Sequence, residues 1–347
     1  MTGTAREPLP NTGAAAQAAA DPDLVWHYTD GPGLISILTH HVLWATSASF
    51  LNDQQEVALG GELIVRRLLE LADQGDDEFF TAMADRVRGS VEEGHGPSAA
   101  GFFILSAARA WDSLVMWRNY GGLAESYAVG LDAGSPLMVL GDEGFEGDTV
   151  LNASFRRFYL RRMPWKPVQY AESEQLALVD AVFDDLPEQM ARMRDGTARL
   201  GVAKEDLADT PQLPPELAAD VASARDALEH ALLLIKHAGF EDEDETRHAF
   251  VLFSDPADEA AQRLEARLLR YRSTAYGIAP YLELTGAAPD QSADAVVAPR
   301  PHQLPIRAVA ISQSPNGSEA TTSLQRLLAS RGYPDVPVLR SAIPFRG

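Results

Sequence analysis

Residues 24–47 read LVWHYTDGPGLISILTHHVLWATS, and this stretch sets the local order of the fold. Residues 24–29 have the aromatic and β-branched side chains typical of a strand. Residues 30–33 contain the glycines and the proline of a turn. The apolar positions of the next segment recur as on one face of a helix: Leu34, Ile37, Leu38 and His41. Because residues 42–47 again look like a strand, the stretch predicts a strand–turn–helix–strand unit.

The rest of the chain extends this pattern into an α+β fold, with strands dominating both ends and helices the middle. Residues 1–23 have almost no large apolar side chains and predict a disordered tail. Residues 24–347 are interpreted as a single α+β domain. Further strand-like runs occupy residues 99–107, 126–132, 245–253, 276–284, 304–312 and 336–344.

Composition narrows the class of protein. The chain of 347 residues has 29 basic and 50 acidic side chains, a net charge of −21. Such a charge is repelled by nucleic-acid phosphates, so a protein or small-molecule partner is favoured over duplex DNA. The chain has no cysteine, which excludes disulfides and thiolate chemistry. No apolar run is long enough for a bilayer and no signal peptide is recognisable, so we predict no membrane partner and a cytoplasmic location.

His27 is the first residue with two interpretations. It shares one strand face with Thr29, while Trp26 and Tyr28 face the other way. The helix N-terminus that follows favours anions, which makes a pyrophosphate near residues 30–34 one interpretation. The other is a core histidine hydrogen-bonded to the backbone.

Two more polar groups follow. Asn52, Asp53 and Glu56 are explained either as a helix cap with a first-turn acid or as part of a site. In the second group, Trp117 and Tyr120 at helical spacing favour a core position. Arg118 between them can bind a phosphate through two hydrogen bonds.

The run Glu241–Glu245, written EDEDE, precedes a strand. If that strand starts near Glu243, then Glu243, Glu245 and Arg247 share one face. A guanidinium beside two carboxylates keeps one of them ionised. The alternative is a solvated strand edge whose charges discourage aggregation. The sequence has no G-x-S-x-G, P-loop, G-x-G-x-x-G or H-E-x-x-H motif.

Taken together, these motifs resemble the bacterial family catalogued as domain of unknown function 2971. The resemblance covers most of residues 24–132 and 236–347. Residues 175–235 do not match and are interpreted as a helical insertion. Ser126 and the segment 313–315 depart from the family pattern. The matching residues are His27, Tyr28, Thr29, Leu43, Trp44, Phe50, Asn52, Asp53, Glu56, Ser106, Asp112, Met116, Trp117, Tyr120, Lys236, Glu243, Glu245, Arg247, Pro280, Tyr281, Ser341, Ile343, Pro344, Phe345 and Arg346.

The opening motif is also similar, more weakly, to ADP-ribosyltransferases of the His-Tyr-Glu type. That resemblance implies a mixed or antiparallel split sheet with flanking helices, and NAD as a substrate with no metal required. In such enzymes a late glutamate contacts the nicotinamide ribose, which implies Glu245 as the catalytic carboxylate, with Glu243 second. The resemblance carries over only to His27, Thr29 and a late glutamate, and Tyr120 and Tyr127 both qualify as the residue that stacks on nicotinamide. The full set of candidate NAD-binding residues is His27, Tyr28, Thr29, Asn52, Asp53, Trp117, Arg118, Tyr120, Tyr127 and Arg247.

The resemblance therefore implies NAD-dependent ADP-ribosyl transfer or NAD cleavage, in bacterial defence or a toxin–antitoxin pair. Cleavage of the nicotinamide–ribose bond passes through an oxocarbenium-like cation, which a fixed carboxylate stabilises. This prediction requires His27 and Glu245 to line one cleft. The alternatives are a non-catalytic module that binds a nucleotide or a protein, and a phosphate-handling enzyme with Mg²⁺ held by Asp53, Glu56, Glu243 and Glu245.

Overall fold

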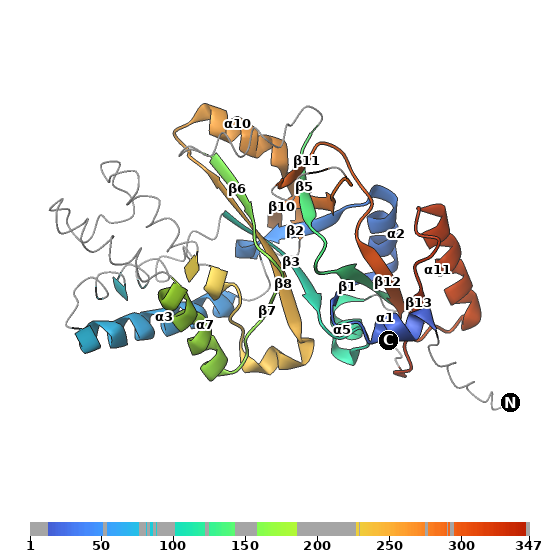
Figure 1. Cartoon of the computed structure of the whole chain (residues 1–347), viewed down its shortest axis with the longest axis horizontal. Helices are drawn as coiled ribbons and strands as arrows, with labels where there is room; N and C mark the ends of the chain where they lie inside the picture. Colours follow the sequence, from blue (N-terminus) through green and yellow to red (C-terminus); the bar gives the residue numbers. More distant parts are fainter. Residues whose placement is uncertain are drawn as a thin grey trace. The chain divides into compact units, whose positions relative to one another are not determined.

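A computed structural model describes the chain as two compact units (Figure 1). It describes residues 13–50, 54–75, 101–121, 125–142, 158–185, 230–274, 277–289 and 295–344, together with 81, 84, 85, 88, 227, 228 and 291. Unit 1 comprises Met1–Thr46, Phe103–Lys166 and Asp242–Gly347, and unit 2 comprises Ser47–Phe102 and Pro167–Glu241. The single domain over residues 24–347 stays a prediction beside this division into two units.

Unit 1 holds most of the strands. Its helices are α1 (Ala14–Ala19), α2 (Gly31–His40), α5 (Leu114–Tyr120), α10 (Glu259–Leu268) and α11 (Ser318–Ser330). Its strands are β1 (Leu24–Asp30), β2 (Leu43–Ser47), β3 (Phe102–Ala108), β4 (Ser126–Asp132), β5 (Leu137–Leu140), β6 (Phe158–Arg162), β8 (Glu245–Ser254), β9 (Leu269–Thr274), β10 (Gly277–Gly286), β11 (Val297–Ala298), β12 (Ile306–Ile311) and β13 (Val338–Arg340). The short strand β7 (Lys166–Pro167) and the 3-10 helix η4 (Ala238–Glu243) span the boundary between the units.

The strand–turn–helix–strand unit predicted for residues 24–47 is present as β1, α2 and β2. Asp30 begins α2, because its Oδ1 accepts a hydrogen bond from the Gly33 amide at 2.7 Å. His41 ends the helix in the left-handed conformation with φ 54°. Local signals in the sequence therefore set both ends of this helix.

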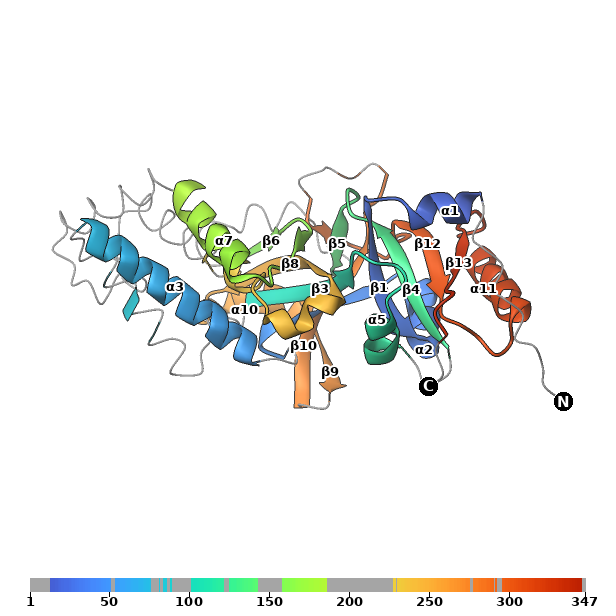
Figure 2. The same cartoon turned by 90° about the horizontal axis from the view of Figure 1, so that it is seen from below.

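The strands form one mixed sheet, consistent with the predicted α+β class. Its main path runs β11-β5-β10-β2-β3-β1-β4-β12-β13, and Figures 1 and 2 show β1, β4 and β12 side by side. Most pairs are antiparallel, whereas β5 with β11 and β12 with β13 are parallel. Strand β3 pairs with β1, β2 and β8. Because a strand has only two edges, two of these partners share one edge of β3, and the sheet divides there.

The two faces of this sheet carry separate apolar clusters. The larger cluster gathers Val25, Leu105, Val129, Phe250 and residues of α2, α10 and α11. The smaller cluster lies on the other face of β1 and β4, where α1 and α5 pack; its members include Ala18, Trp26, Tyr28, Trp117 and Ala128. Alternation along β1 and β4 explains the division, because neighbouring strand side chains face opposite sides.

Part of the predicted disordered tail is a helix. Ala14–Ala19 form α1, and Ala18 is buried in the smaller cluster against β12 and β13. Alanine has the highest helix propensity, and its small side chain allows the helix to lie close to a sheet. The small alanine side chains of the run AAAQAA therefore allow it to pack against the sheet, although it has no large apolar residue that would predict a core position.

Unit 2 is built around helices α3 (Gln54–Gly75) and α7 (Glu172–Asp185), preceded by the 3-10 helix η1 (Ala48–Phe50). Its core combines Leu63, Ile64 and Leu68 of α3 with Val179 of α7 and Ile235. Of the helical insertion predicted over residues 175–235, the structure describes α7 as far as Asp185 and residues 227, 228 and 230–235, and the rest lies outside the described residues. The prediction did not include residues 47–102, which supply the longer helix.

Candidate functional site

The acidic run changes structure at Asp244. Glu243 is the last residue of η4, Asp244 has a left-handed φ of 44°, and β8 begins at Glu245. The strand therefore starts at Glu245, as the strand-like run over residues 245–253 predicts, and the interpretation with a start near Glu243 is wrong because Glu243 lies outside the strand. Glu243 and Glu245 are each only 6% exposed. The interpretation of these two glutamates as a solvated edge is therefore wrong.

Glu245 and Arg247 form a buried ion pair. Arg247 Nε donates to Glu245 Oε1 at 2.9 Å, and Arg247 Nη2 donates to Oε2 at 3.0 Å. Arg247 is 4% exposed. The two residues share a strand face because they are two positions apart, as the sequence predicts. Both carboxylate oxygens are engaged, so this pair neutralises two buried charges within one strand.

Arg109 holds the backbone turn between the two glutamates. Its amide donates to the carbonyl oxygen of Asp244 at 2.9 Å, and its Nε donates to Asp244 Oδ1 at 2.7 Å. A left-handed conformation is uncommon for a residue with a side chain, although aspartate tolerates it better than most. Arg109 therefore stabilises a strained turn that sets the directions of Glu243 and Glu245.

Tyr120 at the end of α5 contacts the first glutamate. Its hydroxyl donates to Glu243 Oε1 at 3.4 Å, while its side chain remains partly in solvent at 41% exposure. Arg118 is exposed on the same helix, and within the described ranges no hydrogen bond or ion pair joins its side chain to the site. The structure therefore joins Tyr120 to Glu243 and leaves Arg118 outside.

Trp117 is a buried support for this helix. Its indole Nε1 donates to Asp112 Oδ1 at 2.9 Å, and Ser341 Oγ donates to the same oxygen at 2.5 Å. The Tyr28 ring packs edge-on at 4.6 Å between centroids, and its hydroxyl donates to the Ala110 carbonyl at 2.8 Å. Trp117 and Tyr28 are thus core residues, which favours the structural interpretation of both.

His27 lies at the division of the sheet. The β1–β3 register consists of the pair Trp26 and Ala108. The imidazole Nδ1–H of His27 donates to the Ser106 carbonyl of β3 at 3.0 Å. Burial lowers the pKa of His27, and the hydrogen bond to Ser106 opposes this only in part. His27 is therefore neutral near pH 7, and it matches the interpretation of a histidine bonded to backbone.

Thr29 and Tyr127 accompany His27 on its face of the sheet. Thr29 lies directly opposite Tyr127 in the β1–β4 register, and the Tyr127 hydroxyl donates to Glu125 Oε2 at 2.8 Å. Burial, and then the adjacent Glu125, raise the pKa of Tyr127. The structure therefore brings together three of the predicted residues here, away from Tyr120 and Glu243.

His27 and Glu245 face opposite sides of the sheet. Val25 and Phe250 belong to the same apolar cluster and so mark one face. His27 is two residues from Val25 and shares its face, whereas Glu245 is five residues from Phe250 and points the other way. The condition for the transferase prediction, that these two residues line one cleft, is not met.

The N-terminus of α2 does not offer the predicted pyrophosphate site. The Asp30 carboxylate already occupies the Gly33 amide, and Pro32 has no amide hydrogen. The carboxylate would also repel a phosphate. The anion interpretation of residues 30–34 is therefore wrong.

Glu125 was missed by the sequence reasoning. It accepts hydrogen bonds from Ser314, from Asn316 Nδ2 at 3.2 Å and from Tyr127. Burial alone would raise its pKa, but these hydrogen bonds outweigh burial and lower it. The segment 313–315, where the sequence departs from the family pattern, thus supports this carboxylate. The spacing of Glu125 and Tyr127, two positions apart, is the feature of the sequence from which this contact could be predicted.

Several predicted residues lie beyond what the structure describes. These are Asn52, Asp53, Phe345 and Arg346, and the side chain of Glu56. Among the described residues, no group of three or more potential metal ligands gathers. The magnesium alternative depends on Asp53 and Glu56 and remains a prediction.

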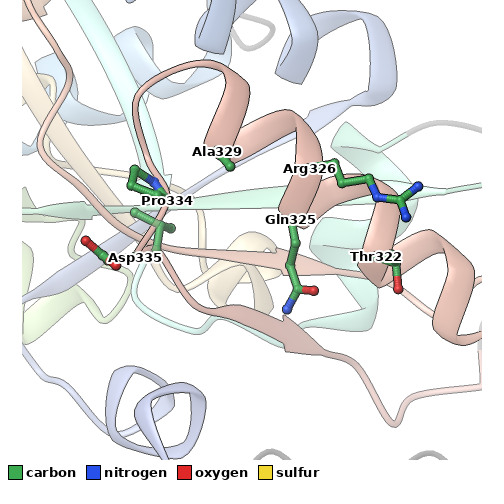
Figure 3. A pocket seen from close by; sticks show the side chains of 7 residues that line it. Thr322, Gln325, Arg326, Ala329, Pro334 and Asp335 are labelled. Carbon is green, nitrogen blue, oxygen red and sulfur yellow. The ribbon is translucent and has the colours of Figure 1, made fainter.

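A pocket of about 400 Å³ lies between α11 and residues 334–336 (Figure 3). Its polar side chains are Thr322, Gln325 and Arg326 of the helix and Asp335 opposite. It contains none of the residues predicted for NAD binding.

Comparison with protein-family models, curated proteins and solved structures finds no match for this chain. The two family resemblances therefore remain predictions. No helix within the described ranges has the length and apolar character needed to cross a bilayer.

Proposed function

We propose that this chain is a nucleotide-binding module, with NAD as the first candidate ligand, and that it does not cleave NAD through His27 and Glu245. The observation that carries the proposal is that these two side chains face opposite sides of the sheet. Both oxygens of Glu245 are also bound by Arg247. A carboxylate in that state is a structural partner and is poorly suited to hydrogen-bond a ribose.

Tyr120 and Glu243 are the proposed binding pair. The half-exposed ring of Tyr120 offers a surface on which a planar base or a nicotinamide can stack. Glu243, held beside it by the Asp244 turn, offers acceptors for ribose hydroxyls. Ring stacking and hydroxyl recognition are the contacts that a nucleoside needs. A nucleotide-binding module therefore follows from residues that lie on one face of unit 1.

Calorimetric titration with NAD and ADP-ribose tests the binding proposal. We expect wild type to bind NAD, and Tyr120→Ala and Glu243→Gln each to weaken binding about tenfold, the effect of losing one charge-assisted or stacking contact. Tyr120→Phe separates the ring from the hydroxyl and should lose less than Tyr120→Ala. Wild type that binds neither ligand would overturn the proposal.

ADP-ribosyl transfer or NAD cleavage is the second candidate, and the Tyr120–Glu243 hydrogen bond favours it. A carboxylate can stabilise an oxocarbenium-like cation, and an aromatic ring beside it can stack on the nicotinamide. Glu243 would take the role implied for Glu245. The division of the sheet at β3 supports an ADP-ribosyltransferase-like fold as part of this candidate. The acceptor would be a protein or a small molecule.

Release of labelled nicotinamide separates the two candidates. The binding module predicts NAD binding without release, also when a cell lysate supplies an acceptor. Release that Glu243→Gln abolishes, while the folded protein still binds NAD, would establish the transferase candidate. Release that depends on Glu245 instead would contradict both assignments made here.

A further inference from the structure

Four residues of unit 1 form an aromatic and cationic cluster on the sheet face away from the larger apolar cluster. Strand β10 places Tyr281 opposite Thr46, Glu283 opposite Trp44, and Ala279 opposite Arg272 of β9. The alternate residues of β10, Leu282 and Leu284, belong to the larger cluster. Trp44, Thr46, Arg272 and Tyr281 therefore share the outer face, and we call them the Trp44 cluster. Figure 2 shows β9 and β10 side by side as a projecting hairpin.

Among the residues that the structure describes, Arg272 has no carboxylate partner. Its Nη2 donates to Thr46 Oγ1 at 2.8 Å, and its guanidinium carbon lies 5.4 Å from the centre of the Trp44 ring. Its Nε is buried without a hydrogen-bond acceptor, and no ion pair joins it to a carboxylate in the described ranges. Burial lowers the pKa of Arg272, which reflects this incomplete compensation. An uncompensated guanidinium attracts an oxyanion.

Arg270 shows the contrast on the same strand. Its Nε lies 3.7 Å from Glu283 Oε2, so a carboxylate already neutralises it. The chain carries a net charge of −21 and has acidic side chains in excess. Within the described part of the chain, the guanidinium of Arg272 therefore has no carboxylate partner, although acidic side chains are in excess.

Trp44 supplies an exposed ring next to this charge. It is 43% exposed, although Tyr281 packs against it at 4.8 Å between ring centroids. Tyr281 and Thr46 are buried and hold the ring and the guanidinium in place. A fixed aromatic ring with a guanidinium beside it matches a ligand that joins a planar base to a phosphate.

We propose that the Trp44 cluster binds a mononucleotide, with the phosphate on Arg272 and the base stacked against Trp44. The cluster shares no residue with the proposed Tyr120–Glu243 pair, so this inference does not depend on the proposed function. Inorganic phosphate should bind through Arg272 alone, and more weakly than a mononucleotide.

The test titrates AMP and inorganic phosphate, following tryptophan fluorescence and the midpoint of thermal unfolding. We expect AMP to quench the fluorescence and both ligands to raise the wild-type Tm. Arg272→Met should weaken the binding of AMP at least about tenfold and abolish the rise in Tm with phosphate. Trp44→Leu should lose the AMP quenching but retain the rise in Tm with phosphate.

Arg263→Met is the matched control, because it removes one positive charge from the exposed surface of α10. It should bind AMP like wild type. Tyr120→Ala should also bind AMP at the Trp44 cluster unchanged, which separates this proposal from the proposed function. The proposal is overturned if wild type binds neither probe, or if Arg272→Met binds both as wild type does while remaining folded by circular dichroism.

Discussion

Arg247 clasps both carboxylate oxygens of Glu245 from two residues along the same strand, with both side chains out of solvent. Removing Arg247 takes from the buried Glu245 carboxylate the guanidinium that binds both of its oxygens. Arg247→Met should therefore lower the free energy of unfolding by about 3–5 kcal/mol. Urea denaturation measures this change in the free energy of unfolding. Arg263→Met breaks an exposed pair with Glu259 and should cost less than about 1 kcal/mol. The double change Glu245→Leu with Arg247→Met should recover most of the loss; equal costs for the two single arginine variants would contradict this account.

His248 makes stability depend on pH. Burial, and then the positive charge of Arg162, lower the pKa of His248 to about 3. Its pKa in the unfolded chain is the ordinary 6.5. Between these two pKa values only the unfolded chain binds the proton. The free energy of unfolding is therefore unaffected by the titration of His248 above pH 6.5, and it falls by about 1.4 kcal/mol for each pH unit below that value.

His248→Phe tests this dependence, because it keeps an aromatic ring beside Trp165 and removes the titrating group. Urea denaturation at about pH 7, 6 and 5 should give a shallower decline in unfolding free energy for the variant than for wild type. Parallel curves for the two proteins would show that His248 does not titrate between its folded and unfolded states.

The positive φ at position 244 should make the stability cost of a substitution depend on the side chain that replaces Asp244. Asp244→Asn keeps a residue that tolerates positive φ and loses only an exposed contact with Arg109, so its cost should stay below about 1 kcal/mol. Asp244→Val places a β-branched residue at the same φ and should cost at least about 1–2 kcal/mol. Thermal unfolding compares the two, and equal Tm values would argue against strain at this turn.

Asp112 should matter through its oxygen acceptor. Asp112→Ala leaves the buried indole N–H of Trp117 without that partner and should cost about 1–3 kcal/mol. Asp112→Asn retains an acceptor oxygen and should cost clearly less. Chemical denaturation provides the comparison; an alanine variant as stable as the asparagine variant would mean that water or another group satisfies Trp117.

The sequence predicted what depends on neighbours along the chain. The order β1, α2, β2 followed from local turn and cap residues, and the Glu245–Arg247 pair followed from strand alternation. It did not predict that Glu243 lies outside β8, because the left-handed turn at Asp244 is fixed by Arg109, 135 residues away. Alternation also shows which residues of one strand share a face, but it does not show which residues of a distant strand lie on that same face of the sheet. The relation of His27 to Glu245 therefore required the pairing of β1 and β8 with β3.

Composition misled the prediction in two places. An acidic run normally lies in solvent. Glu243 and Glu245 are nevertheless buried, because Tyr120 donates a hydrogen bond to Glu243 and Arg247 donates two to Glu245. An alanine-rich segment lacks the large side chains that mark a core, yet Ala18 is buried in one. The Trp44 cluster was not anticipated either, because Arg272 is more than 200 residues from Thr46 in sequence.

The smaller apolar cluster joins Ala18, Trp26 and Tyr28 to Ala308, Ala310 and Leu339. During synthesis the early residues leave the ribosome long before the late ones, so this face of the sheet cannot close until Leu339 has emerged. Contacts over such sequence separations slow folding. A nascent chain would therefore expose Trp26 and its neighbours while about 300 further residues are made, and a chaperone that binds apolar segments could act there during that time.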